Sequence, residues 1–360
     1  MGIFNDILKS DETIFKNVIA LDYDYIPKLV PFREIHQKHM ASCIKPLFQN
    51  RSGRNLFIHG PPGIGKTVAC KHVLKELEEE YDEVEPVYIN CWEKNSSYKI
   101  MLDICERLGY KFTHNKKTDE LFRTVKEILN KKSVVFVFDE IDKVEEYDFL
   151  YWILEQIYKK SIFLITNYKE WLLNLDERIK SRLTAEILEF KPYNLTETKS
   201  IMGQRMSYAF KDGVVDNDAF ETVVKKTYSM QDLRSGLYLL REAGNLAEDK
   251  SLRKITVDLV GAAVKKLDEF TIKKEEGLDK DTKAIFELVK KFPNNMTGEL
   301  YKIFTKNGGD CSAKTFTRKL KKLEEGKFIY IEKITGGADG NTSIIKLASS
   351  QPKERKLTEF

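Results

Sequence analysis

Eight residues of this 360-residue chain, GPPGIGKT, restrict its possible folds more than any other stretch. They follow the apolar run LFIH and precede VACKHVL, which is typical of a helix. Glycines let successive backbone N–H groups turn inward around a phosphate chain, and a helix N-terminus adds a favourable dipole. The spacing G-x-x-x-x-G-K-[ST] between a strand and a helix therefore predicts a phosphate-binding loop. We expect the loop to use Gly60, Gly63, Ile64, Gly65, Lys66, Thr67 and Val68.

Two further apolar runs predict neighbouring strands of a parallel sheet, which is buried on both faces. The first, SVVFVF, leads into Asp139 and Glu140, and the second, SIFLIT, leads into Asn167. Asp139 would hold Mg²⁺ together with the Thr67 hydroxyl, and Glu140 would polarise the attacking water. Asn167 would hydrogen-bond the terminal phosphate or that water. The alternatives are an acidic solvated turn and an asparagine that caps the next turn.

Composition and length exclude several classes of protein. The length suggests two or three domains, and no apolar run approaches the ~20 residues of a membrane span. The N-terminal residues lack the pattern of a secretion signal. The five cysteines are scattered and form no CxxC pair, which favours the reducing cytoplasm over a disulfide framework or a zinc site. A net charge of +4 is too small to imply nucleic acid by itself.

The region from about 192 to 270 predicts a small helical bundle. Apolar residues recur at helical spacing, for example Leu233, Leu237 and Leu240, and no strand-like alternation interrupts them. A bundle that closes over a phosphate site needs a cation aimed inward. Arg234 suits that position.

The C-terminal region predicts three helices followed by a hairpin, the layout of a winged helix-turn-helix. A charged stretch around 270–280 is interpreted as a linker. The helices are expected in TKAIFELVKK, in TGELYKIFTK with Thr297 as its N-cap, and in SAKTFTRKLKKLEEGKF with Ser312 as its N-cap. Strands at 328–333 and 342–347 flank TGGADGN, which is rich in turn residues.

The third of these helices is a candidate for DNA recognition. Phe316, Leu320 and Leu323 form an apolar stripe that would anchor the helix to its core. The remaining faces are cationic and polar, so they could enter a major groove and neutralise phosphates. The alternative is a solvated basic helix in a protein–protein module. The candidate DNA-binding residues are Lys314, Thr315, Arg318, Lys319 and Lys322.

With these motifs in place, the chain resembles AAA+ ATPases, and more narrowly the archaeal DNA replication initiators related to origin recognition complex subunit one and cell division control protein six. VPFREIHQKHM resembles a family box that lines the base pocket, and VYINCWEKNSSYKIMLDICERLG resembles the region that carries a DNA-contacting insertion. LDERIKSRL resembles the box that supplies an arginine to a neighbouring subunit's ATP. FKPYNLTETKSIMGQRMSYAF and MQDLRSGLYLLREAGNLAE resemble two stretches of the lid.

The resemblance assigns roles to several more residues. It implies that Tyr193 and Arg205 lie near the nucleotide and that Arg234 touches the γ-phosphate. For the arginine finger it leaves Arg178 and Arg182 open, and we favour Arg182 because it stands in the Ser-Arg pair. The family has Gly-Asp-Ala-Arg before the lid helix that carries this arginine, where this chain has MQDLR, so the turn there is expected to differ.

The expected fold class is an α/β P-loop AAA+ core with a parallel sheet, a helical lid and a C-terminal winged helix-turn-helix. Expected boundaries are 1–190 for the core, 191–272 for the lid, 273–350 for the winged helix and 351–360 for a flexible tail. This tail resembles a sliding-clamp-binding peptide only faintly.

The resemblance implies ATP or ADP and Mg²⁺ as cofactors, with weak ATP hydrolysis as a switch. Implied partners are origin duplex DNA, a replicative helicase and further copies of the chain on DNA, in the nucleoid. One alternative is a AAA+ DNA-binding regulator of transcription or of plasmid or viral replication with little ATPase activity. A clamp loader or transposition helper is disfavoured by the predicted hairpin, and a signalling NTPase by the absence of downstream repeats.

Overall fold

A five-stranded parallel sheet forms the centre of the first unit in the computed structural model, in the order β2-β3-β4-β1-β5. The structure describes residues 13–276, 278–325, 328–337 and 340–347. The predicted strand at β3 is one residue longer than expected, and β4 ends at Thr166, so Asn167 follows the strand directly. β3 and β4 are neighbours, as predicted. The strands are β1 (Leu56–His59), β2 (Val84–Asn90), β3 (Ser133–Asp139), β4 (Lys160–Thr166) and β5 (Glu186–Glu189).

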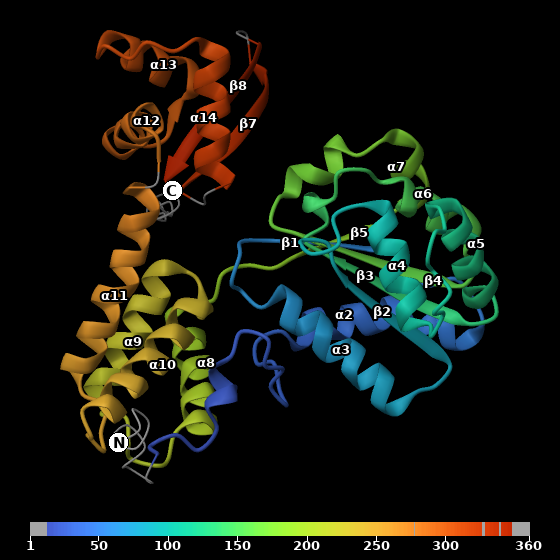
Figure 1. Cartoon of the computed structure of the whole chain (residues 1–360), viewed down its shortest axis with the longest axis horizontal. Helices are drawn as coiled ribbons and strands as arrows, with labels where there is room; N and C mark the ends of the chain where they lie inside the picture. The colour runs from blue at the N-terminus through green and yellow to red at the C-terminus, as the bar shows by residue number, and fades with distance from the viewer. Residues whose placement is uncertain (1–12, 277, 326–327, 338–339, 348–360) are drawn as a thin grey trace, which may run out of the picture. The chain divides into compact units, whose positions relative to one another are not determined.

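Helices cover both faces of this sheet (Figure 1). Alternate residues of a strand point to opposite faces. Phe57, Phe136 and Phe138 accordingly pack on one side in a core with α4, α5, α6 and α7. Leu56 and Ile58 pack on the other side with α2 and α3. The helices are α2 (Glu34–Ile44), α3 (Lys66–Glu80), α4 (Ser97–Arg107), α5 (Thr118–Leu129), α6 (Asp148–Gln156) and α7 (Glu177–Leu183), and the short 3₁₀ turns are η2 (Lys45–Gln49), η3 (Ile141–Lys143) and η4 (Lys169–Asn174).

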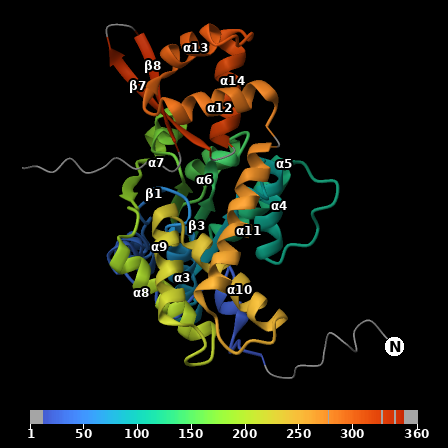
Figure 2. The same ribbon diagram turned by 90° about the vertical axis from the view of Figure 1, so that its left-hand side faces the viewer.

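The lid is helical, as predicted. Its first helix begins with a capping box in which Asn194 and Glu197 bond each other's backbone N–H at 2.9 Å. Both ribbon views show α8, α9 and α10 side by side (Figures 1 and 2). The lid helices are α8 (Leu195–Ala209), α9 (Asn217–Met230), α10 (Leu233–Asp249) and α11 (Val257–Glu276).

An N-terminal strap, residues 13–33, runs along the lid before α2 begins. The backbone N–H groups of Lys16 and Asn17 both donate to the Ala209 carbonyl. Phe15 stacks on Phe210 and occupies the space above Gly244, where an added Cβ would lie 2.4 Å from the Phe15 ring. The glycine therefore lets the strap approach α10 closely, and the strap includes the 3₁₀ turn η1 (Val18–Leu21).

The second unit has the element order of a winged helix-turn-helix (Figure 2). Three helices precede a hairpin, as predicted, and an additional short strand before the second helix completes an antiparallel sheet in the order β6-β8-β7. Phe316, Leu320 and Leu323 are buried in its core. The elements are α12 (Lys280–Lys291), β6 (Asn295–Met296), α13 (Thr297–Lys306), α14 (Ala313–Glu325), β7 (Ile329–Gly337) and β8 (Gly340–Leu347).

Two local predictions differ from the structure. The predicted linker is largely helical, because α11 continues to Glu276 and contains the expected boundary at 272/273. Lys and Glu are good helix formers, so a run of them continues a helix without an apolar pattern to reveal it. Thr297 is the first helical residue and not the N-cap, which is Met296. The Thr297 hydroxyl donates to the Ser343 carbonyl of β8 at 3.1 Å, because β6 pairs with β8 just before the helix.

Two predictions lie partly or wholly outside the described residues. The hairpin tip TGGADGN includes residues 338–339, and the flexible tail was expected at 351–360. Within the described part of the chain, no helix is long and apolar enough to cross a bilayer.

Candidate functional site

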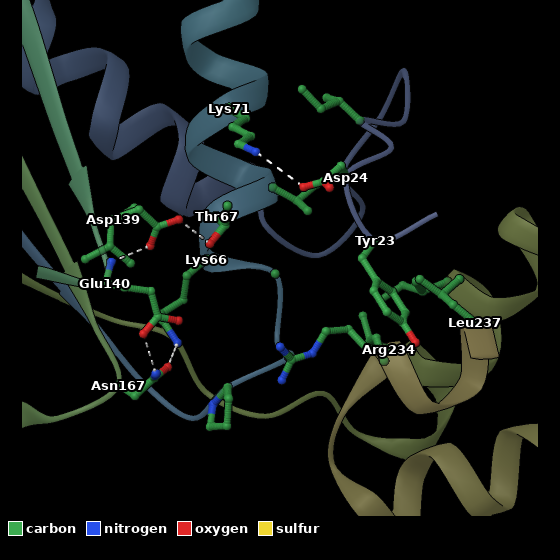
Figure 3. A pocket seen from close by; sticks show the side chains of 18 of the residues that line it. Tyr23, Asp24, Lys66, Thr67, Lys71, Asp139, Glu140, Asn167, Arg234 and Leu237 are labelled. Carbon is green, nitrogen blue, oxygen red and sulfur yellow. Dashed lines mark hydrogen bonds and ion pairs between the residues drawn. The ribbon is translucent and has the colours of Figure 1, made fainter. Parts of the chain in front are cut away.

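A cavity of about 240 Å³ lies at the carboxyl ends of β3 and β4, between the phosphate loop, the lid and the strap. Figure 3 shows Lys66, Glu140 and Asn167 converging on one side of it, with Arg234 extending toward them from the lid. Cavity-lining residues that the sequence predicted are Gly63, Gly65, Lys66, Thr67, Val68, Asp139, Glu140, Asn167, Arg205 and Arg234.

The glycines of the loop are required by geometry. Gly60, Gly63 and Gly65 all have positive φ angles, of 147°, 74° and 86°. A Cβ on Gly60 would lie 2.2 Å from the Phe190 carbonyl oxygen, and one on Gly63 would lie 1.9 Å from a carboxylate oxygen of Asp232. Only glycine fits both positions, so the loop is held between the sheet and the lid with its backbone turned as a phosphate cradle requires.

Lys66 is a buried cation at the base of the cavity. Its Nζ donates to the carbonyl oxygens of Gly60 at 2.7 Å and Pro61 at 2.8 Å, and to Oδ1 of Asn167 at 2.8 Å. Burial lowers the pKa of the Lys66 ammonium to about 8, while the charges of Glu140 and Asp139 act in the opposite direction. A buried ammonium bonded to neutral acceptors is stabilised by an anion, so the residue fits a polyphosphate.

Asp139 and Thr67 are in contact, as a shared cation requires. The Thr67 hydroxyl donates to Oδ2 of Asp139 at 2.6 Å. Asp139 is buried, and its Oδ1 accepts the backbone N–H of Glu140 at 3.0 Å. A hydroxyl and a carboxylate are oxygen ligands of the kind Mg²⁺ prefers. The donor set therefore fits Mg²⁺ beside the phosphate loop.

Asn167 connects the cation of Lys66 with the carboxylate of Glu140. Its Nδ2 donates to Oε2 of Glu140 at 3.2 Å, while its Oδ1 accepts from Lys66. Glu140 has a φ of 55°, an uncommon backbone state for a glutamate. Strained backbone at the end of a buried strand is typical of functional sites.

The lid reaches the phosphate loop at the start of α10. Leu233 N–H donates to the Gly63 carbonyl at 3.1 Å. Arg234 forms a bidentate pair with Asp232, with Nη2 to Oδ2 at 2.6 Å and Nε to Oδ1 at 2.9 Å. This hydrogen bonding raises the pKa of the Arg234 guanidinium, which stays charged.

Four further residues predicted to contact the nucleotide are Arg205, Tyr193, Gly60 and Ile64, and of these only Arg205 lines the cavity. Arg205 lines the cavity, but its guanidinium donates to the strap carbonyls of Ala20 at 3.1 Å and Tyr25 at 3.2 Å. Tyr193 is buried with Arg33 4.0 Å above its ring, and it does not line the cavity. Gly60 and Ile64 are buried and are likewise absent from the cavity wall.

The box VPFREIHQKHM was expected to line the base pocket, but its arginine lies beneath the phosphate loop. Arg33 is 5% exposed and donates to the carbonyls of Ile64 at 3.1 Å and Lys191 at 2.7 Å. It thus ties the loop to the start of the lid.

Sequence reasoning missed the part of the wall that the strap and lid supply. The strap has no periodic pattern, and the lid residues were interpreted only as packing. The missed wall residues include Tyr23, Asp24, Ile26, Ile201, Met202 and Leu237.

The two finger candidates lie on α7 and do not line the cavity of their own chain. Arg182 pairs with Glu155 and lies 5.1 Å above the Tyr151 ring. Arg178 pairs with Asp176 at 3.0 Å. Neither arginine therefore lies at the cavity of its own chain.

The residues of α14 predicted to bind DNA divide into those that have no carboxylate partner among the ion pairs described and those that pair with a carboxylate. Lys314 and Arg318 are exposed. The Thr315 N–H donates to the Ser312 Oγ at 3.2 Å, which is the N-cap bond predicted from the sequence. Lys319 is 15% exposed and pairs with Asp279 and with Asp281 at 3.3 Å. Lys322 is exposed but lies 3.4 Å from Asp279.

One further cluster of possible metal ligands lies outside the cavity, among the described residues. His39, Cys43 and Glu186 have ligand atoms within 4.8 Å of one another. Glu186 is already paired on both oxygens, with His39 at 2.8 Å and with Arg54 at 2.7 Å. Both carboxylate oxygens of the cluster are therefore already engaged by other side chains.

The sheet order, the phosphate loop and the helical lid together define a AAA+ nucleotide-binding protein with a winged helix. Residues 49–172 match the family described as AAA domain, and residues 199–265 match the Cdc6 AAA+ ATPase-type lid domain.

The chain also resembles known proteins along nearly its whole length. It is 31% identical to ORC1-type DNA replication protein 1 of Sulfurisphaera tokodaii, over 97% of this chain and 94% of that one. It is 28% identical to the Archaeoglobus fulgidus protein of the same name, over 100% and 94% of the two chains. The chain belongs to the archaeal Orc1/Cdc6 family of DNA replication proteins.

Solved structures share the fold. The Aeropyrum pernix ORC1 protein in complex with DNA has a TM-score of 0.69 at 24% identity and 95% coverage of both chains. The Aeropyrum pernix ORC2 protein in its ADPNP-ADP complexes has a TM-score of 0.70 at 17% identity, covering 94% of this chain and 95% of that one.

Proposed function

We propose that this chain is an ATP-binding replication initiator that recognises origin duplex DNA, with slow hydrolysis of ATP to ADP as a switch. The observation that carries the proposal is the connected set in one cavity. Lys66, Asn167 and Glu140 are hydrogen-bonded in series, Thr67 bonds Asp139, and Arg234 lines the same cavity from the lid.

In this proposal the phosphate loop holds the phosphates of ATP or ADP with its backbone N–H groups and Lys66. Thr67 and Asp139 would hold Mg²⁺, which would neutralise the charge of the phosphates. Glu140 orients and polarises water, and Asn167 fixes the Glu140 carboxylate. Arg234 exchanges Asp232 for the terminal phosphate. Strap and lid residues such as Tyr23, Ile201 and Leu237 form the wall against the nucleoside.

We propose that α14 binds duplex DNA through Lys314, Thr315, Arg318 and Lys322. These side chains lie on the faces that the buried stripe leaves outward, and the related Aeropyrum ORC1 protein was solved in complex with DNA. Lys319 contributes less in this scheme, because two carboxylates already neutralise it. We further propose that the region from Val87 to Gly109, which includes α4, carries the family's DNA-contacting insertion.

The remaining partners follow from the same scheme. A second copy on DNA would receive Arg182 as its finger, with Arg178 as the competitor, and the DNA-bound chain would recruit a replicative helicase. Its place of action is the nucleoid in the cytoplasm.

Footprinting on genomic fragments with and without ATP tests the proposal directly. Protection of a defined duplex site that depends on nucleotide is expected. Glu140→Gln should still bind ATP and protect the site but fail to turn ATP over, whereas Lys66→Ala should lose ATP affinity while the C-terminal unit still folds. Protection of no site under either condition contradicts the initiator assignment. Burst and steady-state ATP turnover separate this assignment from a regulator with little ATPase activity.

A further inference from the structure

Tyr88, on β2, contacts the candidate metal site from a strand that the sequence analysis did not associate with it. Its hydroxyl donates to Oδ2 of Asp139 at 2.8 Å. β2 and β3 pair in parallel, with Tyr88 opposite Val137 and Asn90 opposite Asp139. This register brings the long tyrosine side chain to the carboxylate at the end of the next strand.

Asp139 is held by three donors, and Tyr88 is one of two that share a single oxygen. Oδ2 accepts both the Thr67 hydroxyl at 2.6 Å and the Tyr88 hydroxyl at 2.8 Å, and Oδ1 accepts the Glu140 N–H at 3.0 Å. Thr67 and Glu140 have their own predicted roles toward the nucleotide. Tyr88 is therefore the donor whose hydroxyl is free of any such role.

The tyrosine ring is itself held in place. The ring packs at the edge of the core formed with α2 and α3, and Lys71 Nζ lies 4.8 Å from the ring centroid. Lys71 Nζ in turn lies 3.7 Å from a carboxylate oxygen of Asp24 in the strap, an ion pair drawn in Figure 3. Burial and the Asp139 charge raise the pKa of the Tyr88 phenol, so it remains a donor at neutral pH.

We propose that Tyr88 is a positioning residue that fixes the Asp139 carboxylate for Mg²⁺ and thereby sets how much Mg²⁺ the protein needs to bind nucleotide tightly. The inference rests on the proposed function, since it uses Asp139 as the metal-binding carboxylate. Without the Tyr88 hydroxyl, the Asp139 carboxylate keeps only Thr67 on Oδ2 and the Glu140 N–H on Oδ1, so its orientation is less firmly fixed.

Tyr88→Phe removes one oxygen and leaves the ring in place, which makes it the informative variant. The probe is a fluorescent ADP analogue, titrated into the full-length protein at a series of Mg²⁺ concentrations and in EDTA. The Mg²⁺ concentration that produces half of the increase in affinity for the ADP analogue should rise about tenfold, as expected for loss of a hydrogen bond to a charged group. Affinity in EDTA should stay within about twofold of the parent, because the phosphate loop is intact.

Tyr147→Phe is the matched control. Tyr147 is also a partly buried tyrosine in the same unit, but its hydroxyl accepts from Trp171 at 3.0 Å, donates to the Ile141 carbonyl at 3.5 Å and does not bond Asp139. This variant should show the Mg²⁺ requirement of the parent protein.

The outcomes separate this inference from the function on which it rests. If Tyr88→Phe lowers the melting temperature but leaves the Mg²⁺ requirement unchanged, Tyr88 is only structural and the inference is overturned. Asp139→Asn should abolish the Mg²⁺ effect altogether. If Asp139→Asn keeps the full effect, the metal assignment in the proposed function fails, and this inference fails with it.

Discussion

Asn167 and Glu140 are joined by a hydrogen bond of 3.2 Å from the amide Nδ2 to a carboxylate oxygen, although 27 residues separate them in the chain. The oxygen of the same amide accepts a hydrogen bond from Lys66 Nζ. An asparagine can serve both partners at once because it carries a donor and an acceptor on one rigid group. Neither partner can move without changing the other's bond.

Asn167→Ala should therefore lower ATP turnover more than ATP binding. Glu140 loses the donor that orients it, and mispositioning of a catalytic base costs roughly 10²-fold in rate. Lys66 keeps the Gly60 and Pro61 carbonyls, so nucleotide affinity should change by less than about tenfold. Steady-state turnover and equilibrium titration with an ATP analogue measure the two effects. Asn174→Ala, which removes an exposed amide bonded to the Glu170 carbonyl, is the control. Equal losses in affinity and turnover would contradict the bridging role.

The lowered pKa of Lys66 makes nucleotide binding dependent on pH. In the free protein this pKa is about 8, and a bound polyphosphate stabilises the charged form. Binding near pH 8 should thus take up about half a proton, and affinity should fall as pH rises above 8. Calorimetry in two buffers with different ionisation enthalpies measures the uptake. Lys66→Arg should abolish it, because arginine stays protonated. An enthalpy independent of buffer in the parent protein would refute the prediction.

The same shift has a defined sign for stability. The native pKa of Lys66 lies below the ordinary value of 10.5, so the unfolded chain binds more protons between about pH 8 and 10.5. The Lys66 contribution therefore makes the free energy of unfolding rise with pH across that interval and leaves it unchanged below.

Local patterns predicted the parts of the fold and site that lie close together in the sequence. The loop from Gly60 to Thr67 stands between a strand and a helix, and each of these elements is marked by its own residues. The apolar run before Asp139 likewise identified β3. In the second unit, the stripe of Phe316, Leu320 and Leu323 identified the buried face of α14.

Contacts between distant segments could not be predicted in this way. Tyr88 and Asp139 are 51 positions apart, and Arg205 and Ala20 are 185 apart. Both pairs depend on strand register or on the course of the strap, which no local pattern encodes. Arg205 matched a family spacing, but its guanidinium is occupied by strap carbonyls that only the folded chain brings to it.

Gln231→Gly should stabilise the protein. Gln231 ends α9 with a φ of 51°, at the position where the family pattern has glycine before Asp-Ala-Arg. A residue with a Cβ in the left-handed region costs about 1 kcal/mol relative to glycine, so a gain of roughly 0.5–1 kcal/mol is expected. The unfolding transition of the first unit, followed by thermal denaturation, measures this gain in stability. Gln231→Ala, which removes the side chain but keeps the Cβ, should give no such gain, and an equal gain in both variants would point to the side chain instead.

Arg318 and Lys319 are adjacent on α14 but should respond differently to substitution. Arg318 is exposed, and Lys319 is bonded to Asp279, the residue that caps α12 by accepting the Thr282 N–H at 3.1 Å. Arg318→Glu should weaken duplex binding and reduce the slope of log affinity against log salt by about 0.9 for the lost phosphate contact. Lys319→Met should leave that slope nearly unchanged and destabilise the second unit by up to about 1 kcal/mol, because its ion pairs are partly exposed to solvent.

Fluorescence anisotropy with a labelled duplex over a range of salt concentrations, together with thermal unfolding, distinguishes the two residues. Lys302→Met, a change at an exposed lysine of α13, is the matched control for loss of positive charge in the same unit. If Lys319→Met reduces the salt slope as strongly as Arg318→Glu, the pairing with Asp279 does not withdraw Lys319 from DNA. In that case Lys319 would leave Asp279 and Asp281 and contact a DNA phosphate when the duplex binds. An unchanged slope in Arg318→Glu would remove α14 as the phosphate-contacting helix.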